Sequence, residues 1–168
     1  RFPINGRVDG WELYELVLIG FPIWYYAAPN IIETFVKSYD FTGATVLIVE
    51  DTPLNMSIAR KLLENVGITV ITAVNGQEAV ERFNMNYDSI NAILMDIRMP
   101  VMDGLEATRL IRSSARKNSR EVPIIAMTAD AFEEDIHRSF ESGMNDHLAK
   151  PINPSLLYET IGRLIKRT

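Results

Sequence analysis

Short apolar runs alternate with segments in which apolar residues recur every three or four positions along most of this chain. The runs are rich in β-branched residues and end at polar or breaker residues, a pattern that predicts strands. The segments between them have the spacing of amphipathic helices. The predicted strands are Leu13–Ile19, Thr45–Val49, Thr69–Val74, Ala92–Met95, Val122–Met127 and His147–Ala149. Strands that alternate with helices indicate parallel βαβ units with right-handed crossovers, so the predicted fold class is α/β.

Capping residues mark where the helices begin and end. Thr52, Asp103 and Asn153 are residue types that favour the N-cap, and a proline suited to the first helical position follows two of them. Gly143 has the residue type that favours the position just after a helix. The predicted helices cover residues 30–36, 53–66, 76–83, 103–111, 132–142 and 154–165.

Composition narrows the class of protein. The 168 residues are 47% hydrophobic and 23% charged, as expected of a globular domain with a real core. The net charge of -5 and the absence of a basic run argue against nucleic-acid binding. Without cysteine there are no disulfides, thiolate nucleophiles or cysteine zinc sites, and a reducing, cytoplasmic location is expected. The apolar run Leu16–Ala28 is broken by Pro22 and is too short to span a bilayer, so no membrane contact by this segment is predicted.

Polar residues of a particular kind follow four of the predicted strands. The central apolar run leads directly into Asp96, and the others lead into Glu50 and Asp51, Thr128, and Lys150. Because the carboxyl ends of parallel strands share one edge of a sheet, these residues should converge there. Singly, each has an ordinary explanation as a helix cap, a strand end or a solvated surface charge. Their occurrence at successive strand ends favours a functional site.

The chemistry of this set suggests phosphoryl transfer. Carboxylates held close together repel one another unless a cation joins them, and Mg²⁺ prefers oxygen ligands of this kind. With Mg²⁺ and the Lys150 ammonium present, the edge would suit a phosphoryl group. Asp96 would then be the nucleophile that forms an aspartyl phosphate, and Thr128 would donate a hydrogen bond to a phosphoryl oxygen.

Five motifs together resemble the receiver domain of two-component response regulators, most closely the receivers attached to hybrid sensor kinases. They are Val-Glu-Asp at 49–51 followed by Asn55, Ala-Val-Asn-Gly-Gln-Glu-Ala at 73–79, Met-Asp-Ile-Arg-Met-Pro-Val-Met-Asp-Gly at 95–104, Ile-Ile-Ala-Met-Thr-Ala at 124–129, and Gly-Met-Asn-Asp-His-Leu-Ala-Lys-Pro at 143–151. The resemblance covers residues 44–167 and implies a flavodoxin-like, doubly wound sheet of strand order 2-1-3-4-5.

The resemblance also implies roles for individual residues. It implies a Mg²⁺ site made of Glu50, Asp51, Asp96 and the carbonyl of Arg98. It implies Asp96 as phosphoacceptor, Thr128 as switch hydroxyl and Lys150 as phosphate partner. The Lys150–Pro151 peptide is commonly cis in the family. The expected activity is self-catalysed phosphorylation and autodephosphorylation of Asp96 rather than turnover of a separate substrate.

One position departs from the family pattern. Receivers usually carry Tyr or Phe three residues before the lysine, and here that residue is His147. A ring that follows the threonine inward is still available, so a two-state switch can survive, and a titrating ring could add a pH dependence. A tolerated substitution is the simpler interpretation. His137 is expected to be an exposed helix residue.

The first forty-three residues resemble a different family. Residues 15–43 are similar to a piece of flavodoxin, with the aromatic loop residues Trp24, Tyr25 and Tyr26. No Ser/Thr-rich phosphate loop accompanies them, so these aromatic residues are interpreted as packing or interface groups rather than a flavin site. We therefore predict a flavodoxin-like βα fragment over 1–43 and a receiver over 44–168, a combination typical of a natural or engineered chimera. The fragment could add an edge strand to the sheet or exchange strands between two chains to form a homodimer.

Three functions remain open at this stage. The leading hypothesis is a phosphorelay receiver that takes phosphate from a histidine kinase or a phosphotransfer protein. The alternatives are a recombined chimera with no physiological activity and a vestigial FMN-binding electron carrier.

Overall fold

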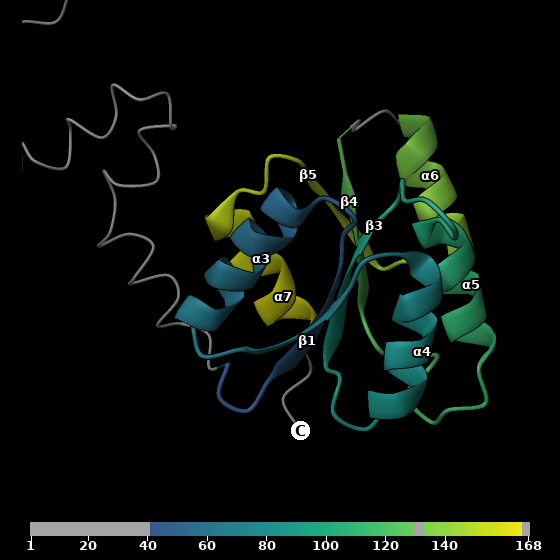
Figure 1. Cartoon of the computed structure of the whole chain (residues 1–168), viewed down its shortest axis with the longest axis horizontal. Helices are drawn as coiled ribbons and strands as arrows, with labels where there is room; N and C mark the ends of the chain where they lie inside the picture. Colours follow the sequence, from purple (N-terminus) through teal and green to yellow (C-terminus); the bar gives the residue numbers. More distant parts are fainter. Residues whose placement is uncertain (1–40, 130–132, 166–168) are drawn as a thin grey trace, which may run out of the picture. The chain divides into compact units, whose positions relative to one another are not determined.

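Five parallel strands form one sheet in the order β2-β1-β3-β4-β5. A computed structural model of the chain describes residues 41–129 and 133–165. Figure 1 shows the sheet running through the centre of this part of the chain. The strands are β1 (Thr45–Val49), β2 (Thr69–Ala73), β3 (Ala92–Asp96), β4 (Ile124–Thr128) and β5 (Asp146–Ala149). This order confirms the predicted doubly wound fold.

Helices cover both faces of the sheet. They are α3 (Pro53–Asn65), α4 (Gly76–Asn86), α5 (Gly104–Ser113), α6 (Glu133–Ser142) and α7 (Pro154–Leu164). In Figure 1, α3 and α7 lie on one face, and α4, α5 and α6 lie on the other. The Tyr158 hydroxyl of α7 donates a 3.0 Å hydrogen bond to the carbonyl of Leu62 in α3, which joins the two helices of the first face.

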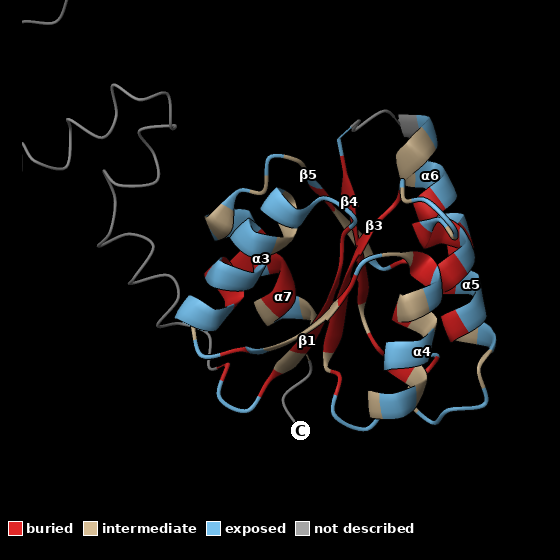
Figure 2. Ribbon diagram, in the orientation of Figure 1, coloured by how far each residue is buried: buried red, intermediate tan, exposed pale blue. Residues whose placement is uncertain are grey.

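Burial on two faces explains why the central strands are continuous apolar runs. Every residue of β3 and of β4 is buried, and Figure 2 shows these strands in red beneath largely exposed helix surfaces. On the α4–α5 side the core contains Phe83, Ile93 and Ile111, all with no exposed surface. A parallel sheet covered on both faces has no solvent side, so the period-2 alternation of polar residues is absent.

Most predicted helix ends are confirmed by hydrogen bonds. The Asp103 carboxylate accepts from the backbone N–H of Glu106 at 2.7 Å, and the Asn153 side chain accepts from that of Leu156 at 3.2 Å. Gly143 has φ +102°, as predicted for the position after a helix. Thr52 is the N-cap residue of α3, as predicted, but its side chain makes no cap bond to the helix.

The predicted elements within the described residues are present, with shifted ends. Helix α4 continues past Phe83 to Asn86, and β4 begins at Ile124 rather than Val122. Pro123 lies at that strand start, where it has no N–H to donate to a neighbouring strand. The predicted strand over 13–19, the aromatic loop and the helix after Asn30 lie outside the described residues. Among the helices that the structure describes, none is long and apolar enough to cross a membrane.

The receiver-like unit extends slightly beyond its predicted start. Residues Tyr39–Thr168 form one compact unit of the chain. Phe41 is 5% exposed, and its ring centroid lies 6.4 Å from that of Tyr158. The predicted boundary between residues 43 and 44 stays a prediction, and Phe41 contributes to the core of the unit that follows it.

Candidate functional site

The strand register brings the predicted residues to one edge of the sheet. Val49 is paired with Met95, and Asp96 with Met127, so the residues that follow β1 lie beside the end of β3. On the other side, Thr128 is paired with Ala149, which places Lys150 just beyond the end of β4. The sheet thus collects side chains that are far apart in sequence, as predicted.

Three carboxylates meet at this edge. Glu50, Asp51 and Asp96 each offer an oxygen atom, and these atoms all lie within 4.8 Å of one another. Glu50 and Asp96 are buried, with 2% and 6% of their surface exposed, whereas Asp51 is exposed. Two buried anions and one anion open to solvent therefore share a space small enough for a single cation to contact all three.

The Lys150 ammonium bridges the two buried carboxylates. Its Nζ lies 2.6 Å from Asp96 Oδ2 and 2.7 Å from Glu50 Oε2. The other Glu50 oxygen accepts from the Asn55 side-chain amide at 3.0 Å and from the backbone N–H of Thr52 at 3.4 Å. Glu50 is thus held at one oxygen by the start of α3 and at the other by Lys150, the residue that follows β5.

The pKa directions reflect burial and incomplete charge compensation. Burial raises the pKa of Asp96, and the Glu50 charge adds to this, against the opposing Lys150 hydrogen bond and charge and the Arg98 N–H. Burial would lower the pKa of Lys150, but the hydrogen bonds and charges of Asp96 and Glu50 together outweigh it and raise that pKa. One ammonium is shared by more than one carboxylate, so the cluster favours additional positive charge.

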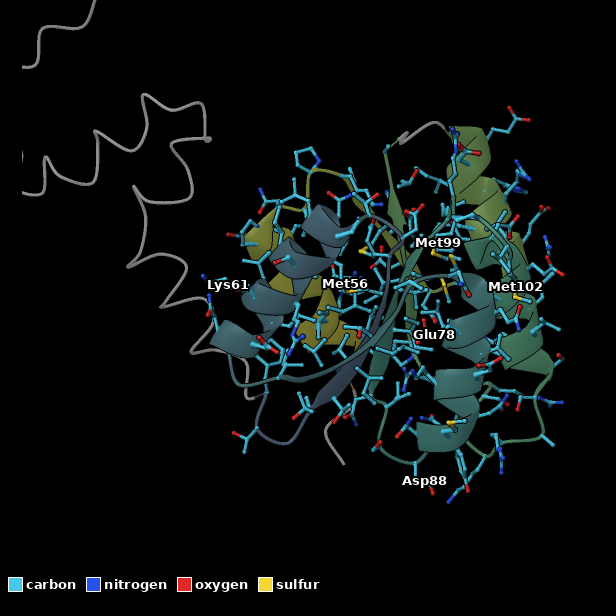
Figure 3. All side chains as sticks on the ribbon, in the orientation of Figure 1. Met56, Lys61, Glu78, Asp88, Met99 and Met102 are labelled. Carbon is cyan, nitrogen blue, oxygen red and sulfur yellow. The ribbon has the colours of Figure 1, made fainter. Side chains whose placement is uncertain are left out.

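The loop after Asp96 is built on a close backbone approach. A Cβ at Gly104 would lie 2.1 Å from the carbonyl oxygen of Asp96, so only glycine fits there. The Gly104 N–H donates to the Ile97 carbonyl at 2.9 Å, and the Arg98 N–H donates to Asp96 Oδ1 at 3.3 Å. Figure 3 shows Met99 and Met102 of the same loop beside α4 and α5. Gly104, the first residue of α5, therefore packs directly against the end of β3 and fixes its position.

Comparison with known proteins decides the family. The family model of the response regulator receiver domain matches residues 46–162. This chain belongs to the receiver domain family. A second family model, that of flavodoxin, matches residues 1–81, which is less than half of the chain, so that likeness remains a resemblance.

Two curated relatives illustrate where such receivers occur. Hybrid signal transduction histidine kinase I of Dictyostelium discoideum is 39% identical over 123 residues, which span 71% of this chain and 7% of that protein. Sensor protein GacS of Pseudomonas syringae is 37% identical over 117 residues, which span 69% of this chain and 13% of that protein. The chain therefore spans a small part of the length of these relatives.

Solved structures give the same family. A receiver domain of a sensor histidine kinase from Pseudomonas aeruginosa, with a magnesium ion coordinated in its active site cleft, is 41% identical with a TM-score of 0.66, over 74% of this chain and 98% of that one. A co-crystal structure of the Saccharomyces cerevisiae histidine phosphotransfer protein Ypd1 with the receiver domain of Ssk1 matches at 35% identity and a TM-score of 0.66, over 73% of this chain and 88% of that one.

The remaining predicted residues of the receiver lie where the sequence indicates. Thr128 is buried at the end of β4, and its carbonyl accepts from the Lys150 N–H at 2.7 Å. The Arg98 side chain is 68% exposed and pairs with Asp135 of α6 at 2.9 Å. The direction of the Arg98 carbonyl toward a metal stays a prediction. The Lys150–Pro151 peptide is cis, and His137 is exposed, both as predicted.

His147 lies in the position of the family's aromatic ring. Its ring stands edge-on to that of Phe140 in α6, with centroids 6.4 Å apart. Its Nδ1 is buried without a hydrogen bond and lies 3.9 Å from Asp146 Oδ1. The packing thus keeps a ring beside α6, and whether His147 takes part in a switch stays a prediction.

The receiver's donor set fits a hard divalent cation. All three acidic groups offer oxygen, one of them is open to solvent, and a single ammonium compensates only part of their charge. Two supporting roles were not predicted. Asn55, which belongs to the first motif, lies in the first turn of α3 and donates to Glu50, a role that its position in the motif could have indicated. Asp135 carries no local signal, because it meets Arg98 only through the fold.

Proposed function

We propose that this receiver accepts a phosphoryl group on Asp96, with Mg²⁺ held by Glu50, Asp51, Asp96 and the Arg98 carbonyl. The observation that carries the proposal is the position of the Asp96 carboxylate. It lies 2.6 Å from Lys150 Nζ and shares a space less than 4.8 Å across with the oxygens of Glu50 and Asp51. The magnesium ion in the cleft of the Pseudomonas aeruginosa receiver supports this assignment.

Each residue then has a separate role in phosphoryl transfer. An Asp96 oxygen attacks phosphorus, and a P–O bond forms as the P–N bond of a phosphohistidine breaks. The imidazole nitrogen leaves with the bonding electrons and takes a proton from solvent. Lys150 compensates charge on the phosphoryl oxygens, and Thr128 donates a hydrogen bond to one of them. The metal ion, when bound, would neutralise charge that develops in line during transfer.

The donor in this proposal is a histidine kinase or a histidine phosphotransfer protein. The likeness to the Ypd1–Ssk1 co-crystal structure and to the hybrid kinases supports it. After transfer, Thr128 would move toward the phosphoryl group, and the His147 ring would follow beside α6. Water then attacks the aspartyl phosphate, which releases inorganic phosphate and returns the Asp96 carboxylate, so the receiver acts as a switch rather than as an enzyme with a separate substrate.

The test is labelling by a small phosphodonor. Wild type incubated with acetyl phosphate and Mg²⁺ should gain one phosphoryl group by intact mass, and Asp96→Asn should gain none. Asp88→Asn is the matched control, because Asp88 is an exposed aspartate at the far end of α4 (Figure 3). Labelling of Asp96→Asn at the wild-type level would overturn the assignment.

Other predictions stay proposals beside this one. These are the boundary between residues 43 and 44, a homodimer, the absence of nucleic-acid and membrane contact, and a cytoplasmic location. The family match beginning at residue 46 supports the boundary. Limited proteolysis followed by mass spectrometry would test it, since a resistant fragment that begins near residue 41 is expected. Light scattering would distinguish a monomer from a dimer.

A further inference from the structure

An ion pair connects the loop that follows Asp96 to helix α6. The Arg98 guanidinium lies 2.9 Å from Asp135 Oδ2. Arg98 belongs to the loop between β3 and α5, and Asp135 belongs to α6, which follows the strand that ends in Thr128. The pair therefore joins the segment after Asp96 to the helix downstream of Thr128.

The two segments that the pair joins are separated by a cavity. A space of about 420 Å³ lies between the loop and α6, with Ile97, Met99 and Leu105 on one side and Asp135 and Arg138 on the other. Close packing between the loop and α6 is thus interrupted at this point. The side chain of Asp135 is only 20% exposed, so its attraction to Arg98 is screened less than that of a fully exposed pair.

Arg98 is held at its two ends. Its backbone N–H donates to Asp96 Oδ1 at 3.3 Å, a long bond that is weak by itself. Its guanidinium is held by Asp135. Fixing the far end of the side chain restricts the backbone dihedral angles of Arg98. These angles set the direction of the N–H that touches Asp96 and of the carbonyl predicted to face the metal, which lie in the two peptide units on either side of the Arg98 Cα.

We propose that Asp135 is a positioning residue, which acts through the Arg98 side chain to hold the Arg98 peptide against Asp96. This inference rests on the proposed function for its effect on Mg²⁺ and phosphorylation. Its effect on the peptide itself does not depend on that function. Without the pair, the Arg98 amide should open more often, and Mg²⁺ should bind more weakly.

Two single variants separate this role from simple electrostatics. Arg98→Gln and Asp135→Asn change the charge near the site in opposite directions, so a pure charge effect would move the Mg²⁺ affinity in opposite directions. Loss of the pair instead weakens Mg²⁺ binding in both, by roughly two- to fivefold, the range expected for one partly exposed ion pair. Arg138→Gln is the control, because it removes a nearby positive charge, 3.8 Å from Asp135, and leaves the Arg98 pair in place.

The experiment uses the full chain at physiological salt. NMR hydrogen exchange without Mg²⁺ should show faster exchange of the Arg98 amide in both variants and unchanged exchange in β3. Calorimetric Mg²⁺ titration should then show the weaker binding in both. The exchanged pair Arg98→Asp with Asp135→Arg should restore the slow exchange and most of the affinity.

The outcomes judge the two proposals separately. Opposite shifts in Mg²⁺ affinity, or an Arg98 amide whose exchange does not change, would overturn the positioning role even if Asp96 is phosphorylated. Faster Arg98 exchange in both variants, with rescue by the exchanged pair, would support that role even if Asp96→Asn were still labelled, which would refute only the phosphoacceptor assignment.

Discussion

Two partly buried cations in this receiver have different kinds of partner: Lys150 is surrounded by carboxylates, and Arg112 by neutral oxygens. Lys150 Nζ lies within 2.7 Å of two carboxylates at the carboxyl edge of the sheet. Arg112 of α5 meets neutral oxygens: its Nε donates to the Gly143 carbonyl at 2.9 Å, and its terminal nitrogens donate to the Ser119 carbonyl and the Asn145 side chain at 2.8 Å each. Burial lowers the pKa of Arg112.

The difference separates a charge that is matched by neutral groups and supports the fold, that of Arg112, from a charge that lies among carboxylates at the proposed site, that of Lys150. The planar guanidinium of Arg112 is matched by three dipoles on two loops, which ties α5 to the loops before β4 and β5. Asn145 continues this network by accepting from the Ile124 N–H at 2.8 Å. At the carboxyl edge, anions outnumber the ammonium, so binding of a cation is electrostatically favourable, and a phosphoryl group becomes favourable once that cation is present. Four predictions test this division, from the largest effect to the smallest.

The largest effect is expected on phosphorylation when Lys150 is replaced. Lys150→Met removes the ammonium that faces the phosphoryl oxygens, so the rate of labelling by acetyl phosphate should fall by roughly a hundredfold, as for the loss of one stabilising donor. Arg112→Met, measured on folded protein, should change this rate by less than about threefold, because it would perturb the site only through the fold. Equal losses in the two variants would remove the distinction between the two cations.

The second effect is on the free energy of unfolding, where Arg112 is expected to matter more than Lys150. Arg112→Met removes the Arg112 donor from two backbone carbonyls and one of the two donors to the Asn145 side-chain oxygen, so it should lower the free energy of unfolding by about 3 kcal/mol in urea titration. Arg109→Met in the same helix is the control, because Arg109 is exposed, and a change below about 0.5 kcal/mol is expected. A loss of less than about 1 kcal/mol in Arg112→Met would show that water replaces its hydrogen bonds.

The third effect concerns metal addition and removal. Mg²⁺ at ten times its dissociation constant should raise the free energy of unfolding by about 1.4 kcal/mol, and chelation with EDTA should reverse this. Asp51→Asn should bind Mg²⁺ roughly tenfold more weakly because it removes one charged ligand. At the same Mg²⁺ concentration it should therefore show less than half of that gain. If wild type and Asp51→Asn gained equally, Asp51 would not be a ligand.

The smallest effect is expected at an ordinary surface charge. The Val74 N–H and the Arg82 side chain lower the pKa of Glu78 below its usual value. A lowered pKa means that the ionised form is favoured by folding, so its contribution is present above the unfolded pKa and is lost as pH falls through the folded pKa. Glu78→Gln should therefore cost well under 1 kcal/mol near neutral pH and nothing in acid. Unfolding curves at several pH values would check this, and a deficit that grows in acid would contradict it.

The sequence indicated the carboxyl edge of the sheet because its residues stand at or just after the ends of predicted strands. Asp96 after four apolar residues, and Lys150 before a proline, are local signals that survive without knowledge of the fold. The strand order fixes which ends are neighbours, and it followed from the family resemblance rather than from hydrophobic pattern. The convergence of these residues was thus predictable, whereas their roles in metal binding and phosphoryl transfer stay proposals.

The network of Arg112 could not be predicted in this way. Two of its three acceptors are backbone carbonyls, and every residue carries such a carbonyl, so no residue type marks the partner. Thr52 occupies the N-cap position that the sequence predicted, but its hydroxyl makes no bond to the helix and donates to the neighbouring Asp51 at 3.3 Å, a contact that residue type alone does not mark.

Phe41 shows that the receiver defined by packing begins earlier in the chain than the receiver defined by sequence likeness. By sequence it belongs to the flavodoxin-like stretch, yet its side chain is almost fully enclosed and faces the ring of Tyr158 in the last helix. If the chain arose by joining two genes, an aromatic residue from the flavodoxin-like segment now fills a space in the core of the receiver. Anyone excising the receiver at the point where the family likeness begins would leave that space open beside α7.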